Sequence, residues 1–227
     1  FVVVGWRVYG AIAGFILGAV IAFLISLKLL KKVYRNKEEN LLAGNIYSYA
    51  KPTIFITGII VLFYSIDIII AKILFEPEIA GAYAIASILG KTIIWGSIPI
   101  GKAMFPLSVE SENNPLAKNN VIKTTFFILG ILIMFGLIAF YFLSDLIVRI
   151  FSGKYIAESA NILFSLGVSF SLIAISNTVL LYQLSIGKVK KYKILILCNL
   201  VQIGLLMLGS SSLNQFANYF VISSIIL

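Results

Sequence analysis

Histidine is absent from the 227-residue sequence, cysteine occurs once, and 9 acidic residues stand against 18 basic ones. The lack of histidine removes the commonest proton shuttle and metal ligand, and a single cysteine, Cys198, cannot build a disulfide framework. The sequence also lacks G-x-S-x-G and any paired metal-ligand spacing. These absences indicate a protein that is not an enzyme and that uses no cofactor and no metal.

Apolar residues are present in large excess. They make up 60% of the chain, and the mean hydropathy is +1.05, whereas ordinary globular domains are about 45–50% apolar. Several stretches exceed the roughly 18 apolar residues that mark a membrane-spanning helix. We therefore expect an all-α, polytopic helical membrane protein.

Apolar segments and short polar loops alternate along the whole sequence. The chain starts with phenylalanine, and both of its ends lie inside apolar runs, so we expect a fragment of a longer protein. Pro52 is expected in the first turn of the second span, and Pro106 is expected to mark a helix end. The expected spans cover residues 8–30, 52–74, 81–102, 121–143, 160–186 and 194–209, followed by a truncated seventh.

Lysine and arginine are distributed unevenly between the loops. The loops at 28–51, 102–123 and 187–193 carry 13 of them, and the alternate loops and the N-terminal tail carry 3. Because cytoplasmic loops collect basic residues, we expect these three loops in the cytoplasm. The stretch KVKKYK in the last loop is expected to meet anionic lipid headgroups, not nucleic acid.

Asp67 lies inside the second span, in IVLFYSIDIIIAKIL. Because a central aspartate costs about 2.5–3.5 kcal/mol on the insertion scale, such a residue usually faces a bundle interior or a wet cavity. Lys72 lies about 140° away around the same helix and is a poor partner, whereas Lys91 of the third span has a comparable depth. The pair could fix two helices together, or it could form a cavity site for a coupling ion or an anionic substrate.

Helical projection adds further candidates for a substrate pathway. Tyr83 and Ser87 share one side of the third span with Lys91. The stretch ILGKT resembles the end of a P-loop, but Ile85 occupies the position of the first glycine, which excludes nucleotide binding here.

In the fifth span, five polar side chains form a stripe within about 80° of arc around the helix, which indicates either helix packing or an aqueous path. Its members are Asn161, Ser165, Ser169, Ser176 and Gln183, and Asn199 with Gln202 form a shorter version in the sixth span.

Pro99 and Gly101 are hinge candidates near the inner end of the third span. Proline inside a helix removes a hydrogen bond and bends the helix. Such bends can serve as hinges in alternating access.

The segment YSYAKPTIFITGIIVLFYSIDIIIAKILFEPEIAGAYAIASILGK resembles the start of the C-terminal lobe of bacterial polysaccharide flippases. These belong to the multidrug/oligosaccharidyl-lipid/polysaccharide exporter superfamily. The family pattern is a proline that opens a helix, an aspartate near its outer end, a turn with glycine and tyrosine, and a small-residue helix that ends near a proline. FSGKYIAESANIL and IGKVKKY resemble later loops, so the likeness covers about 1–220. The matching residues are Pro52, Asp67, Gly81, Tyr83 and Pro106.

The resemblance implies a transporter of about 12–14 helices in two lobes, in the bacterial plasma membrane. Its substrate would be an undecaprenyl-pyrophosphate-linked oligosaccharide, with other polysaccharide assembly proteins as further partners. Residues 1–30 would hold the last helix of the N-terminal lobe, 31–51 a basic cytoplasmic linker, and 52–227 the C-terminal lobe with five full spans and a truncated sixth. Lys91 would then be the best candidate for a cationic cavity residue.

Three other functions remain open. A multidrug/cation antiporter of the same superfamily would favour an acidic cavity, whereas the spans here set Asp67 against Lys91. A membrane polysaccharide polymerase or ligase would need a large outer catalytic loop, and the longest outward loop covers only residues 144–159. A purely structural assembly subunit would tolerate Asp67→Leu.

Overall fold

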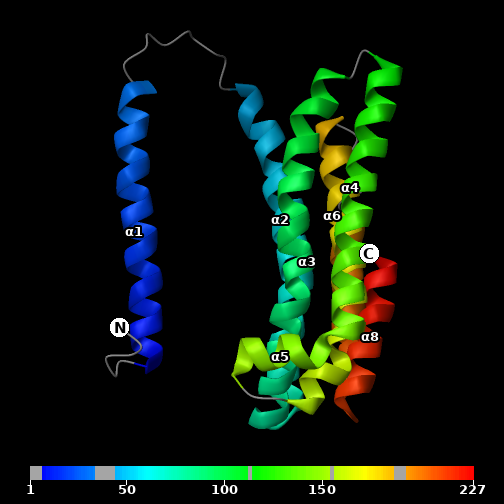
Figure 1. Cartoon of the computed structure of the whole chain (residues 1–227). Helices are drawn as coiled ribbons and strands as arrows, with labels where there is room; N and C mark the ends of the chain where they lie inside the picture. Colours follow the sequence, from blue (N-terminus) through cyan, green and yellow to red (C-terminus); the bar gives the residue numbers. More distant parts are fainter. Residues whose placement is uncertain (1–6, 34–43, 112–113, 154–155, 187–192) are drawn as a thin grey trace. The chain divides into compact units, whose positions relative to one another are not determined.

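The computed structural model describes residues 7–33, 44–111, 114–153, 156–186 and 193–227. Among these residues it contains helices and no strand (Figure 1). The chain divides into two compact units, Phe1–Tyr47 and Ser48–Leu227. The helices are α1 (Arg7–Val33), α2 (Gly44–Leu74), α3 (Pro77–Glu110), α4 (Pro115–Phe142), α5 (Ser144–Ser152), α6 (Ala157–Ser185), α7 (Lys193–Leu208) and α8 (Leu213–Ile226).

The protein is an all-α polytopic membrane protein, as the composition predicts. Among the described residues, four helices have the length and apolarity to cross a bilayer, namely Thr53–Leu74 of α2 and the whole of α3, α4 and α6. The described parts of α1 and α7 contain shorter apolar stretches, Ile12–Lys28 and Ile194–Leu208. Four of the expected spans are therefore supported by length and composition.

Two of the expected helix boundaries are wrong, and the described parts of the expected loops 28–51 and 102–123 are largely helical, because α1 and α3 extend into them from one side and α2 and α4 from the other. Helix α2 begins at Gly44, so Pro52 lies well inside it instead of in its first turn. Helix α3 passes through both Pro99 and Pro106 and ends at Glu110. Proline removes only one intrahelical hydrogen bond, which neighbouring groups can compensate in membrane helices. The burial of Met104 and Ser108, on either side of Pro106, shows that packing continues past the proline.

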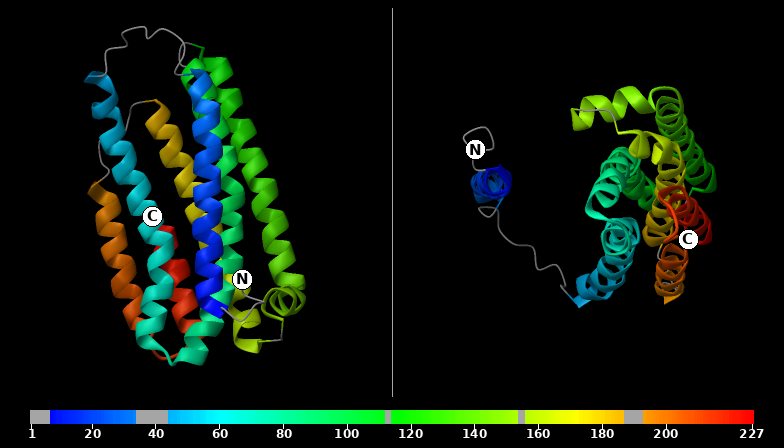
Figure 2. Two further views of the ribbon diagram at one scale, coloured as in Figure 1. Left: turned by 90° about the vertical axis from the view of Figure 1, so that its left-hand side faces the viewer. Right: turned by 90° about the horizontal axis from the view of Figure 1, so that it is seen from below.

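Helix α5 lies within residues 144–159, which the sequence pattern predicts as a loop. It follows α4 after a single residue, Leu143, and lies crosswise to the long helices at one end of the unit (Figures 1 and 2). Its C-cap is Gly153, with φ of 73°, the left-handed conformation that ends many helices. The chain thus turns away from α4 before α6 begins at Ala157.

The core of the unit Ser48–Leu227 is built around α3 and α6, with α4 and α8 packed on them (Figure 2, right). Edge-to-face aromatic pairs lie within this core. Tyr83 lies 5.0 Å from Phe216, and Phe170 lies 5.3 Å from Phe220, measured between ring centroids. Such pairs contribute about 0.5–1.5 kcal/mol beyond their buried area.

Asn114 is the N-cap of α4, and its side chain accepts hydrogen bonds from the backbone N–H groups of Leu116 and Ala117, both at 3.2 Å. We expect Asn114→Ala to cost about 1 kcal/mol of stability, since two N–H groups lose their partner. Hydrogen exchange at Leu116 and Ala117 should become faster. The control Asn119→Ala, at an exposed position inside the same helix, should leave exchange at these amides unchanged. Equal protection in both variants would contradict the capping role.

Candidate functional site

Asp67 and Lys91 form a salt bridge between α2 and α3. The Lys91 ammonium nitrogen lies 3.1 Å from Asp67 Oδ1. Asp67 is fully buried and Lys91 is 5% exposed. Lys91, the partner that the sequence favours for Asp67, is thus confirmed. Lys72, which lies on the same helix as Asp67, is exposed.

Two hydroxyl groups complete the surroundings of the carboxylate. Ser87 donates to Asp67 Oδ2 at 2.5 Å, and Tyr83 donates to the same oxygen at 3.2 Å. Tyr83, Ser87 and Lys91 are spaced four residues apart on α3, so their side chains form one row along that helix. A carboxylate in an apolar surrounding needs a counter-charge and hydrogen-bond donors, and this row supplies both.

Aromatic rings from two further helices cover the salt bridge. The ring of Phe170 on α6 has its centroid 5.5 Å from the Lys91 nitrogen, within reach of a cation–π contact. Phe216 on α8 packs edge-on against Tyr83. The cluster of Asp67, Tyr83, Ser87 and Lys91, which we call the Asp67 cluster, is thereby enclosed by α2, α3, α6 and α8.

The enclosure of the Asp67 cluster helps to distinguish the two roles that the sequence leaves open for Asp67 and Lys91. These are a contact that fixes two helices together and a cavity site for an ion or an anionic substrate. Two surface cavities of the described chain, of about 620 and 540 Å³, are lined by other residues: Glu78, Ala82 and Glu158 belong to the first, Pro99 and Thr125 to the second. The Asp67 cluster lines neither cavity. Within the unit Ser48–Leu227 its geometry is that of a salt bridge that fixes two helices.

Ser169 and Ser176, the candidates on α6, lie apart from the hydrogen bonds of the Asp67 cluster. Ser169 is buried and donates to the carbonyl of Ser165 on its own helix, at 3.1 Å. Ser176 is half-buried. Ser159 instead provides a hydrogen bond between α6 and α3, donating to the carbonyl of Ala82 at 2.7 Å. Ser159 precedes the expected span, and no pattern in the sequence distinguishes it.

The hinge candidates occupy different surroundings. Pro99 is exposed, whereas Gly101 is buried. A Cβ atom at Gly101 would lie 2.8 Å from Leu181 Cδ1 of α6, so the glycine permits close packing of α3 on α6. Helix α3 is continuous through both residues, and a hinge there stays a prediction.

Two buried amides attach α7 to α2. Gln202 Nε2 donates to the carbonyl of Phe63 at 2.7 Å. Asn199 Nδ2 donates to the carbonyl of Leu195 on its own helix at 3.1 Å and reaches that of Ile59 at 3.5 Å. Both contacts favour the packing role for this polar pair.

We expect Gln202→Leu to lower the free energy of unfolding by only about 0.6 kcal/mol, the average for interhelical hydrogen bonds in membranes. The side-chain oxygen of Gln202 is buried and has no partner among the described residues, so leucine also removes an unsatisfied acceptor. The exposed Gln215 of α8 provides the control, Gln215→Leu. A loss far above the observed maximum of about 1.7 kcal/mol would mean that Gln202 does more than join two helices.

The sequence predicts the four polar members of the Asp67 cluster and misses its aromatic cover. Phe170 and Phe216 lie in helices where most residues are apolar, so nothing in the pattern separates them from other core residues. Comparisons of the chain with protein-family models, with curated proteins and with solved structures found no match.

Proposed function

We propose that this chain belongs to a flippase that moves undecaprenyl-pyrophosphate-linked oligosaccharide repeat units across the bacterial plasma membrane. The product would be a surface polysaccharide such as O-antigen, capsule or exopolysaccharide. The observation that carries the proposal is the hydrogen bond between Asp67 and Tyr83, at 3.2 Å. These are two positions of the flippase-like sequence pattern, and they meet in one buried cluster although 16 residues separate them along the chain.

The proposed role of the Asp67 cluster is mechanical. Transporters with two lobes alternate access largely by rocking one lobe against the other as rigid bodies. A lobe that moves in this way needs strong links between its helices. The salt bridge joins α2 to α3, and the aromatic contacts of Lys91 and Tyr83 extend the link to α6 and α8.

In this proposal the second unit corresponds to the C-terminal lobe. Residues 1–30 contribute the last helix of the N-terminal lobe, and 31–51 form the linker between lobes. The basic segments 28–51, 102–123 and 187–193, including the helix ends that they contain, lie in the cytoplasm, in keeping with the excess of Lys and Arg. Much of this linker and of the last loop falls outside the described residues.

The cation antiporter is the weaker alternative. A carboxylate that binds a cationic drug needs a free side facing a cavity. Asp67 instead accepts hydrogen bonds from Lys91, Ser87 and Tyr83 and is fully buried. The polymerase or ligase alternative is weakened by the outer segment 144–159, where the short helix α5 occupies most of the length.

The test uses cells that lack the gene for the protein containing this chain. A flippase predicts that complete lipid-linked repeat units accumulate on the cytoplasmic face and that surface polysaccharide is lost. Normal polysaccharide with increased drug sensitivity would favour the antiporter. Repeat units that reach the outer face but stay unpolymerised would favour the polymerase or ligase.

A further inference from the structure

Helix α5 carries large apolar side chains that the rest of the described chain leaves uncovered. Leu146 is 51% exposed and Ile150 is 74% exposed. The same short helix also bears an acidic and a basic residue, Asp145 and Arg149. One apolar face of this helix packs on the rest of the protein, and the other, with Leu146 and Ile150, is exposed. An exposed apolar face of this kind indicates a further partner that covers it.

The side chains of α5 fall into three sectors around its axis. At about 100° per residue, Ile147 and Val148 lie on one side, and both pack into the core of the unit. Asp145 and Arg149 form a second sector, and Leu146 and Ile150 form a third, each centred about 100–130° from its neighbours. One sector thus faces protein over most of its length, one is charged, and one is apolar and exposed; Phe151, at the C-terminal end of the first sector, is 54% exposed and adds to the apolar surface. A helix at the boundary between lipid and water meets these three environments at once.

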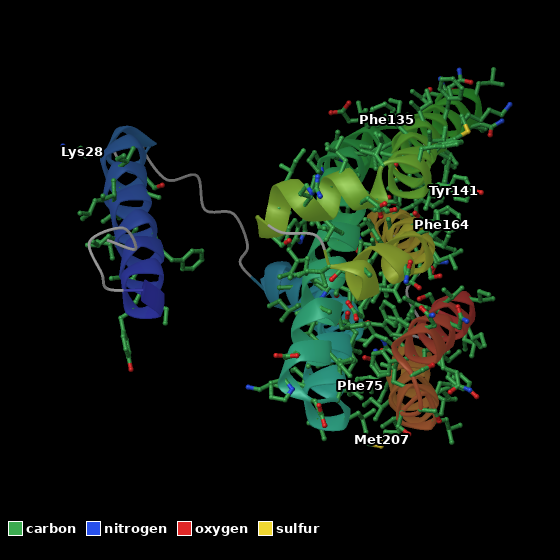
Figure 3. The ribbon with its side chains drawn as sticks, turned by 60° about the horizontal axis from the view of Figure 1, so that its bottom comes forward. Lys28, Phe75, Phe135, Tyr141, Phe164 and Met207 are labelled. Carbon is green, nitrogen blue, oxygen red and sulfur yellow. The ribbon has the colours of Figure 1, made fainter. Side chains whose placement is uncertain are left out.

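The depth of α5 agrees with such a boundary. Residues 124–142 of α4 and Leu143 after them carry no charge, and they extend over about 30 Å, the thickness of the hydrocarbon core. Tyr141, near the end of this stretch, is 65% exposed and packs edge-on against Phe164 of α6 (Figure 3). Exposed tyrosine is typical of the membrane–water interface. The chain therefore leaves the hydrocarbon where α5 begins.

The exposed apolar sector of α5 continues a surface that already faces lipid. On α4, Phe135 is 77% exposed and Ile138 is 52% exposed, and both lie within a membrane span. Leu143, the residue between α4 and α5, is 47% exposed and precedes the exposed Leu146 by three residues. Because the bilayer covers the first part of the surface, the bilayer is also the partner that fits its continuation.

We infer that α5 is an interfacial helix that lies in the plane of the membrane surface opposite the basic loops. Leu146 and Ile150 insert at the boundary between headgroups and acyl chains. Arg149 and Asp145 face the headgroups and water, where Arg149 can contact lipid phosphate. This inference does not depend on the transported substrate. It assigns to α5 the role of fixing the depth of the ends of α4 and α6.

The experiment places single cysteines in the full-length protein, with Cys198 replaced by serine. Ile150→Cys and Leu146→Cys report the apolar sector, Arg149→Cys reports the charged sector, and Phe135→Cys is the control in the middle of a span. Each is labelled with an environment-sensitive fluorophore and reconstituted in vesicles of phosphatidylethanolamine and phosphatidylglycerol. Quenching is then measured with nitroxide lipids labelled near the headgroup or near the end of the acyl chain, and with a water-soluble quencher.

The inference predicts that the labels at 146 and 150 lose more fluorescence with the shallow nitroxide than with the deep one. The label at 149 should be quenched mainly from water, and the label at 135 mainly by the deep nitroxide. Labels at 146 and 150 that respond only to the water-soluble quencher would overturn it. Protection of both labels from every quencher would also overturn it, because another protein would then cover this face. Since all four positions are exposed, the labels should not disturb folding, and correct behaviour of the label at 135 verifies this.

Discussion

Asp67→Ala is expected to destabilise the folded protein by about 3–5 kcal/mol, the typical cost of removing one partner of a buried ion pair. The alanine leaves the Lys91 ammonium in an apolar site where it is 5% exposed and has lost its counter-charge. Ser87 and Tyr83 lose their acceptor in the same step. The free energy of unfolding of the purified protein in mixed micelles measures the effect.

Two further variants make this prediction specific to the pair. Lys72→Ala, on the same helix and exposed, should change stability by less than about 0.5 kcal/mol. Asp67→Leu combined with Lys91→Met should recover much of the loss, because buried ion pairs can be replaced by apolar residues of similar volume at little cost. An Asp67→Ala variant as stable as Lys72→Ala would refute a structural role for the salt bridge.

Gly90→Ala is the second substitution with a large expected effect. A Cβ atom at this position would lie 2.6 Å from Cδ2 and 2.9 Å from Cε2 of Phe170. Phe170 is fully buried and packs against both Phe220 and Lys91, so its ring cannot move without disturbing the cover of the Asp67 cluster. We expect overpacking to cost about 1–3 kcal/mol, more than the roughly 0.5–1 kcal/mol that alanine contributes over glycine in a helix.

Gly130 of α4 is the matched control for Gly90. It is also helical, but a Cβ atom there meets nothing within 4 Å. Gly130→Ala should therefore stabilise the protein by about 0.5–1 kcal/mol, a change of opposite sign. Adding Phe170→Leu to Gly90→Ala should recover part of the loss. If both glycine variants change stability in the same direction, the close approach of α3 and α6 at Gly90 is not as described.

The polar part of the site could be predicted because few interactions can satisfy a charge within a membrane. Asp67 needs a partner, the short turn after α2 makes α3 its neighbour, and Lys91 is the cation at a matching depth. Helical periodicity then adds Tyr83 and Ser87, because residues four apart share a face. These arguments use chemistry and spacing alone. The hydrogen bonds of the Asp67 cluster join the same four residues that the arguments select.

The features that escaped prediction depend on tertiary packing. Pro106 suggests a helix end, but burial of residues on both sides of it carries α3 on to Glu110. Helix α5 has only nine residues and carries both Asp145 and Arg149, so a search for long apolar runs treats it as part of a loop. The rings of Phe170 and Phe216 become part of the site only because α6 and α8 pack over α3.

The central claim of a flippase is tested most directly with the purified full-length protein in liposomes that contain a lipid-linked oligosaccharide. A sugar-oxidising reagent that cannot cross the bilayer reports how much oligosaccharide lies in the outer leaflet over time. The proposal predicts that the protein brings the inner-leaflet fraction to the reagent much faster than protein-free liposomes do, and that Lys72→Ala retains this activity while Asp67→Ala loses it. A folded protein that leaves the inner-leaflet oligosaccharide as protected as it is in protein-free liposomes would contradict the proposal.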